Sequence, residues 1–160
     1  MYIYQQPPTM QERKEGVIIG PAVVLQTRND DRFSETDDVV DAVHELSALL
    51  TLGQERQRKK SIKKIVYRAV GRDDTLDGDD LFLLSSVQSH LAISHVYLTD
   101  AYSRFIRTGH LPPAEYILAN PEWCACRIGR TKWHNLLEPD GRVEALRAVM
   151  AVIAWLKRDL

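Results

Sequence analysis

The spacing of apolar residues along the chain predicts a mostly helical protein. Between Ser34 and Gly53, apolar side chains recur every three or four residues, as they do on the buried face of an amphipathic helix. Residues 54–70 continue as a second helix. A seam with a period of about 3.5 residues predicts a long helix from about Asp80 to Thr108, with the following members: Leu84, Val87, Leu91, Leu98, Tyr102 and Phe105.

Shorter elements complete this pattern. β-branched runs on both sides of Gly20-Pro21 predict an N-terminal strand pair or one bent extended segment. Two short helices are expected over residues 114–120 and about 131–137, and a last helix over residues 142–157. We therefore expect a mainly α fold, a helical bundle with a short N-terminal extended or β segment.

The domain organisation predicted from this pattern is simple. Residues 1–15 are polar and carry prolines, which predicts a flexible arm. Residues 16–160 are then a single, mostly helical domain, of a size able to bury its own core.

Composition narrows the class of protein further. The chain has 160 residues, 44% of them hydrophobic, and a formal net charge of −1, as in an ordinary soluble domain. No apolar run approaches the roughly 20 residues of a membrane span, and the N-terminus lacks the regions of a signal peptide. Two cysteines near the C-terminal end fit a reducing cytosol. We therefore expect a cytoplasmic protein with no membrane partner.

Charge is segregated along the chain although the total is near zero. Residues 54–72 carry eight basic side chains and one acidic side chain, whereas residues 73–100 carry six acidic and no basic ones. Lys and Arg clustered on one helix can neutralise phosphates and release counterions. The expected phosphate contacts are Arg56, Lys59, Lys60, Lys63 and Lys64. The alternative interpretation is a solvated helix face that packs near the acidic segments.

Residues 113–138 form the second candidate site. The stretch Cys126-Arg-Ile-Gly-Arg-Thr-Lys-Trp-His-Asn-Leu-Leu137 resembles the turn and recognition helix of helix-turn-helix DNA-binding proteins. The resemblance implies that Ile128 and Trp133 pack inward and that Arg130 contacts guanine. The groove-facing residues that it implies are Arg130, Thr131, Lys132 and His134. The alternative is two short helices that only pack on the bundle.

A metal site and a catalytic site are the remaining chemical options. Cys124, Cys126, His110 and His134 are possible zinc ligands, but zinc sites usually place two to four residues between paired cysteines. We therefore expect thiols that pack, with no metal and no cofactor. The chain has no G-x-S-x-G nucleophile elbow and no H-E-x-x-H helix, so an enzyme is not expected.

These observations predict a regulator of transcription that binds duplex DNA. Its size and architecture are similar to those of phage or mobile-element regulators, including late-gene antiterminators. The basic helix and the recognition helix are expected to meet in one surface, while the acidic segments face away or contact a protein such as RNA polymerase. The alternative is a helical protein-interaction module, for instance a phage-encoded inhibitor or assembly factor, that binds no nucleic acid. The long seam and the segregated charge would also suit a homodimer.

Overall fold

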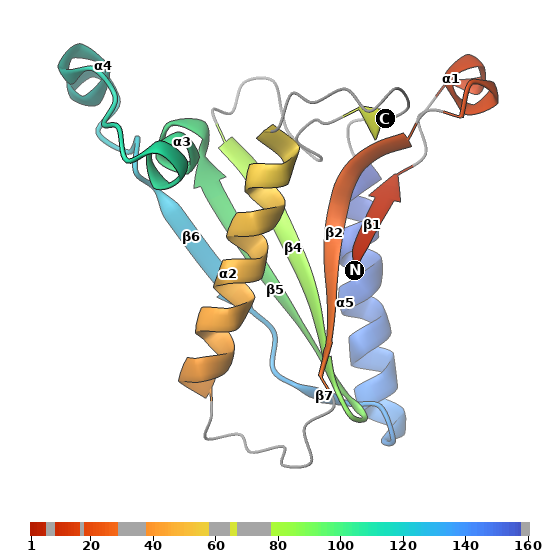
Figure 1. Cartoon of the computed structure of the whole chain (residues 1–160). Helices are drawn as coiled ribbons and strands as arrows, with labels where there is room; N and C mark the ends of the chain where they lie inside the picture. Colours follow the sequence, from red (N-terminus) through yellow and green to blue (C-terminus); the bar gives the residue numbers. More distant parts are fainter. Residues whose placement is uncertain (6–8, 17, 29–37, 58–64, 67–77, 158–160) are drawn as a thin grey trace.

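A mixed β-sheet forms the centre of the molecule, and one long helix lies on each of its faces (Figure 1). The computed structural model describes residues 1–5, 9–16, 18–28, 38–57, 65–66 and 78–157. The helices are α1 (Met10–Lys14), α2 (Asp38–Gln57), α3 (Asp100–Thr108), α4 (Ala114–Ala119) and α5 (Pro139–Lys157). The strands are β1 (Tyr2–Gln5), β2 (Ile18–Arg28), β3 (Ile65–Val66), β4 (Gly78–Val87), β5 (His90–Thr99), β6 (Cys126–Arg130) and β7 (His134–Asn135).

The order of the strands explains where the two long helices lie. The sheet runs β1-β2-β4-β5-β6, with β3 beside β2 and β7 beside β5. β2 pairs in parallel with β3 and β4, and the other neighbouring strands are antiparallel. Parallel neighbours need a crossover connection, and α2 lies in the connection between β2 and β4. It covers one face of the sheet, while α5, which follows β7, covers the other (Figure 1).

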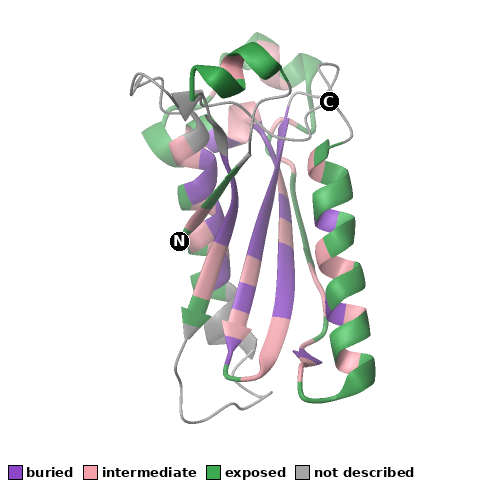
Figure 2. Ribbon diagram, turned by 90° about the vertical axis from the view of Figure 1, so that its right-hand side faces the viewer, coloured by how far each residue is buried: buried purple, intermediate pink, exposed green. Residues whose placement is uncertain are grey.

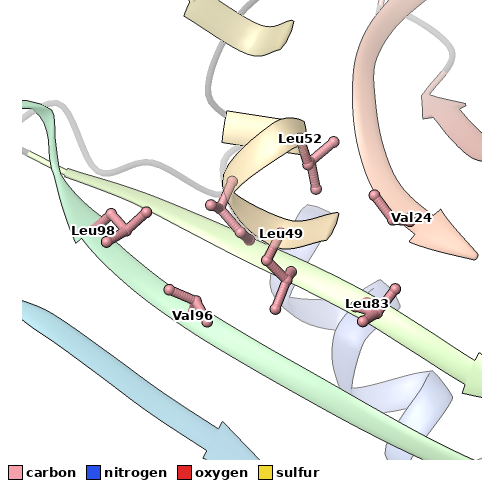
Figure 3. Close-up of a cluster of buried hydrophobic side chains, with 7 residues drawn as sticks. Val24, Leu49, Leu52, Leu83, Val96 and Leu98 are labelled. Atoms are coloured by element: carbon pink, nitrogen blue, oxygen red, sulfur yellow. The ribbon is translucent and has the colours of Figure 1, made fainter. Parts of the chain in front are cut away.

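The core lies in two layers, one on each side of the sheet. Towards α2, Leu49 and Leu52 pack against side chains of β2, β4 and β5 (Figure 3), which are Val24, Leu81, Leu83, Val96 and Leu98. Towards α5, Val152 packs against Ala22, Val23, Phe82 and Ile93. A fully buried Leu or Val contributes about 1.5–3 kcal/mol. Figure 2 shows this burial concentrated in the central strands.

The expected mainly α fold is wrong: the protein is mixed α/β. The predicted long helix over residues 80–108 is a hairpin of β4 and β5 followed by the nine residues of α3. Residues 81–83 are all buried because β4 is covered on both faces, and such a strand loses the two-residue alternation that reveals strands in a sequence. The hairpin turn contains no glycine or proline either, and Gln88 takes the positive φ of 50°.

The expected helix-turn-helix is also wrong. Residues 126–130, interpreted as its turn and the start of its recognition helix, form β6, which pairs with β5 from Ser94 to Leu98. His134 and Asn135 form β7 at the other end of β5, so the predicted helix over residues 131–137 is absent. Ile128, predicted to pack inward, is 62% exposed.

Other expected elements are present with shifted ends. α2, α4 and α5 correspond to the helices predicted over 34–53, 114–120 and 142–157. The predicted helix over 54–70 is partly wrong, because α2 extends through Gln57 and residues 65–66 form β3. The rest of that segment, 58–64 and 67–70, lies outside the described residues.

The N-terminal segment 1–15, for which a flexible arm is predicted, contains the strand β1 and the short helix α1. Within the segment 1–15, β1 pairs with β2 in the sheet, and the Met1 ammonium donates to the Leu25 carbonyl oxygen over 2.9 Å. Around Gly20-Pro21 the structure has the second of the two predicted alternatives, one bent extended segment, because β2 is a single curved strand (Figure 1).

An aromatic cluster holds the base of the segment between β5 and β6. Thr99 caps the start of α3, and Gly109 ends it with a φ of 71°. Trp123 makes edge-to-face contacts with Tyr102 and Phe105, at ring-centre distances of 6.3 and 5.8 Å. Above this cluster, α4 stands away from the sheet and has no buried residue (Figure 1).

Candidate interaction surface

Arg130, expected to contact a base, lies in an ion pair inside the protein. It is the last residue of β6, and its Nε lies 3.4 Å from Glu45 Oε2 on α2. Ser94 Oγ donates to the same carboxylate oxygen over 2.6 Å, and the guanidinium lies 4.8 Å from the centre of the Trp133 ring. The side chains of Glu45 and Arg130 are only 4% and 21% exposed. This arrangement ties α2 to the edge of the sheet.

The residues after Arg130 are also engaged within the fold. The Thr131 amide donates to the Ile93 carbonyl oxygen, and its hydroxyl oxygen accepts from the Ile93 amide. Lys132 Nζ lies 2.7 Å from Glu144 Oε2 on α5, and His134 Nδ1 lies 3.3 Å from the same oxygen. His134 is buried. The predicted groove-facing residues therefore bind α2, β5 and α5.

Glu144 is the acidic centre of this group. Lys132 lowers the pKa of the Glu144 carboxyl, through both its hydrogen bond and its charge, and His134 adds to the effect. The contacts with Lys132 and His134 attach the first half of α5 to the strand that precedes it.

The second predicted nucleic-acid element cannot be placed. Lys59, Lys60, Lys63 and Lys64 lie outside the described residues, and for Arg56 only the helical backbone of α2 is described. The expected joint surface of a basic helix and a recognition helix is therefore wrong, because the recognition helix is absent. Phosphate binding by the lysines themselves stays a prediction.

The candidate metal ligands are spread over several elements. Cys126 lies in β6, Cys124 just before it, His110 after α3, and His134 in β7. Both cysteines are free and exposed, and partial burial raises the pKa of the Cys126 thiol. Within the described part of the chain, no three His, Cys, Asp or Glu residues are grouped so that they could hold a metal ion.

A His–Asp pair lies on the α5 face of the sheet. His95 Nε2 is 2.7 Å from Asp80 Oδ1, and this carboxylate is only 8% exposed. The imidazole stacks on Phe82, with ring centres 4.7 Å apart, and meets the edge of Trp155 at 6.4 Å. Its described neighbours thus link β4, β5 and the C-terminal end of α5.

The outer side of α5 is the most conspicuous apolar surface among the described residues. Four side chains at spacings of three, four and three share one side of this helix, and all are exposed: Val143 at 47%, Leu146 at 63%, Met150 at 54% and Ile153 at 37%. We refer to these four residues as the α5 stripe. The sheet-facing side of the same helix carries Ala145 and Val152, which are buried (Figure 2).

The charges around the α5 stripe are mostly positive. At about 100° per residue, Arg142, Arg147 and Lys157 lie within about 80° of the centre of the stripe. All three are exposed. The two acidic residues of α5, Asp140 and Glu144, lie about 100° and 140° from that centre. The stripe is therefore an apolar strip with a basic border.

The sequence predicts the apolar residues of α5 but not which of them face the sheet and which face outward. The helix predicted over residues 142–157 has one apolar set, which consists of Val143, Leu146, Val149, Met150, Ile153 and Leu156. Together with the alanines, this set spans a wider angle around the helix axis than contact with one sheet can bury. That spread indicates in the sequence that some of the residues face outward. No sequence pattern marks Glu45 and Ser94 as partners of Arg130, because only the fold brings these residues together.

Comparisons with protein-family models, with curated proteins and with solved structures found no match to this chain. None of the described helices combines the length and the apolar character needed to cross a membrane.

Proposed function

We propose that this protein is a protein-interaction module, and that the α5 stripe docks an acidic amphipathic helix of a partner protein. The observation that carries the proposal is the exposure of four large apolar side chains on one side of a helix whose other side already packs on the sheet. A continuous exposed apolar strip is typical of a docking site, whereas singly scattered apolar residues are not.

The spacing of the stripe favours a helix as the docked element. Intervals of three, four and three residues form the seam along which two helices pack, with side chains of one inserting between those of the other. A partner helix with its own apolar residues at this spacing would cover all four side chains.

The border of the stripe favours acidic charge on the partner. Arg147 and Lys157 would face acidic residues beside the partner's apolar seam, and this pairing steers association and selects against basic helices. Arg142 adds positive charge nearby, although its Nη1 already donates to the Leu136 and Leu137 carbonyl oxygens. The same charges oppose docking of α5 on a second α5 in parallel, because Arg142 would then lie near Arg147 of the other helix.

The nucleic-acid proposal now depends on the basic segment 54–72 alone. Arg130, Thr131, Lys132 and His134 have partners inside the fold, and the end of β6, a short link and β7 take the place of the recognition helix. Duplex DNA remains a proposed partner through the lysines of that segment, and RNA polymerase a proposed protein partner. The two free cysteines are compatible with a cytoplasmic location.

A pair of designed peptides tests the docking proposal. Both carry leucine and isoleucine at helix-seam positions; one has glutamate and the other lysine at the flanking positions. Fluorescence anisotropy of the labelled peptides should show binding of the glutamate peptide that weakens as salt is raised, and little binding of the lysine peptide. Equal binding of both peptides, or binding of neither, would contradict the proposal.

Variants of α5 make the test specific to the stripe. Leu146→Ser with Met150→Ser should weaken binding of the glutamate peptide at least about tenfold, since buried apolar anchors dominate such interfaces. Ala151→Ser is the matched control, because Ala151 is exposed on the same helix but lies about 120° from the centre of the stripe. A labelled DNA duplex at low salt forms the third arm. Duplex binding without peptide binding would favour the nucleic-acid proposal instead.

A further inference from the structure

β6 forms one edge of the sheet, and its outer side is accessible. It is the last strand in the order β1-β2-β4-β5-β6, and in the described part of the chain β5 is its only strand neighbour. Residues 126–129 are exposed, and Ile128 is 62% exposed. Figure 1 shows β6 at the outer margin of the sheet, on the side opposite β1. An unpaired edge of this kind is a template for another strand.

Hydrogen bonds to β5 define which backbone groups of β6 point outward. The Thr99 amide donates to the Ala125 carbonyl oxygen, and the Thr131 amide donates to the Ile93 carbonyl oxygen. In an antiparallel pair such bonds recur at every second residue, so residues 127 and 129 also face β5. The amide and carbonyl groups of Cys126 and Ile128 therefore point away from the sheet.

We infer that β6 pairs antiparallel with β6 of a second copy of this chain, about a two-fold axis at Ile128. The two Ile128 residues then exchange a pair of backbone hydrogen bonds and bring their exposed side chains together. The sheet continues through both copies, with α2 of each on one face and α5 of each on the other. This inference uses the opposite side of the molecule from the α5 stripe and stands independently of the proposed function.

The register about Ile128 suits a second copy better than an arbitrary peptide. It is the register that pairs all five residues of β6 with their equivalents. Arg127 then lies opposite Gly129 of the second copy, and an added Cβ at Gly129 would have no atom within 4 Å, so there is room for the arginine side chain. A register centred on Arg127 would place two arginines directly opposite each other, which is destabilising.

α4 supplies further contact area to the same interface. Pairing of two five-residue strands alone buries less than the roughly 1,200 Å² of a stable interface. α4 stands out from the body on the side of β6 (Figure 1), and its Leu118 is 83% exposed. Each α4 would therefore extend towards the second copy and add contact area to the paired strands.

Sedimentation equilibrium of the 160-residue chain over a range of concentrations tests this inference. The unmodified chain should form dimers, and Ile128→Pro should raise the dimer dissociation constant at least about tenfold, since it removes both central hydrogen bonds. Because the Ile128 amide points outward, this proline costs no bond between β5 and β6. Ile128→Val, which keeps the amide, is the matched control and should dimerise like the unmodified chain.

Disulfide trapping supplies a second, independent readout. In a background with Cys124→Ser and Cys126→Ser, Ile128→Cys should yield a covalent dimer on mild oxidation, because facing residues of such a pair lie within disulfide reach. Val143→Cys in the same background is the control and should stay monomeric on reducing-agent-free gels. A chain that is monomeric at every concentration, or a dimer trapped through position 143 and not 128, would overturn the inference. If the proline variant fails to fold, the trapping experiment alone decides.

Discussion

α2 and α5 have nearly the same length and cover opposite faces of one sheet, but they use their apolar residues differently. α2 directs Leu49 and Leu52 into the core, where both are almost completely buried. Among its described side chains, Val43 is the only large apolar one that is exposed. α5 buries Ala145 and Val152 against the sheet and exposes the four residues of the stripe. The difference shows that the stripe exceeds what the fold itself requires.

The largest expected effect is a difference between α2 and α5 in how much the loss of one leucine side chain lowers the free energy of unfolding. Leu52→Ala should lower the free energy of unfolding by about 2–5 kcal/mol, because the side chain is fully buried and its loss leaves a cavity. Leu146→Ala on α5 should change it by less than about 0.5 kcal/mol. Urea unfolding followed by circular dichroism measures both. A large loss for Leu146→Ala would mean that the stripe is part of the core, and would end the comparison.

The second prediction concerns the polar contact that fixes α2. Glu45→Ala should destabilise the protein by about 3 kcal/mol, because Arg130 would remain largely buried without this carboxylate. Replacing both partners, Glu45→Leu with Arg130→Met, should recover much of that loss. Thermal unfolding of the single and double variants checks this. Equal destabilisation by the single and double variants would show that the ion pair is not the cause.

A third prediction addresses how α5 is anchored at its start. A Cβ at Gly141 would lie 2.0 Å from the Asn135 carbonyl oxygen, and a backbone atom cannot rotate away. Gly141→Ala should therefore cost about 1–3 kcal/mol by pushing the first turn of α5 off β7. Gly129→Ala, where there is open space, is the control and should cost less than about 1 kcal/mol. Similar unfolding midpoints for the two variants in urea would contradict the close contact.

The smallest expected effect is a pH dependence of stability that comes from Glu144, which contacts Lys132 and His134. Because the folded pKa of Glu144 is depressed, its contribution to stability is present above the unfolded pKa and is lost as pH falls through the folded pKa. Lys132→Ala should raise this pKa towards that of an ordinary glutamate and so reduce the fall in stability at acid pH. Carboxyl NMR titration of Glu144 measures the shift, which high salt should shrink. An unchanged pKa in the variant would rule out Lys132 as its cause.

The sequence pattern located helices that have one apolar side and missed strands that are buried on both faces. α2 and α5 were predictable because their apolar residues recur at helical spacing, and α4 because prolines stand at both of its ends. β4 was not, since residues 81–84 are apolar on both sides of the strand and also fit a helical seam. The turn at Gln88 lacks the glycine that usually announces a hairpin.

The candidate sites were less predictable than the helices, for a similar reason. The sequence predicts Arg130 and Lys132 as basic side chains available to DNA, because their partners, Glu45 and Glu144, lie far away in the sequence. Only the pairing of β6 with β5, and the packing of the two long helices, brings these charges together. The apolar residues of the α5 stripe can be identified in the sequence, but only the fold shows which apolar residues of α5 the sheet covers.

The aromatic cluster of Tyr102, Phe105 and Trp123 has a practical consequence for handling this molecule. It joins the two ends of the segment between β5 and β6, so a change in the length of that segment need not disturb the sheet. The link between α3 and α4 at residues 110–111 is exposed, and closing a longer loop there adds little entropic cost. A tag or fluorescent label inserted at this link would therefore report on assembly of the protein, while the rest of the fold stays intact.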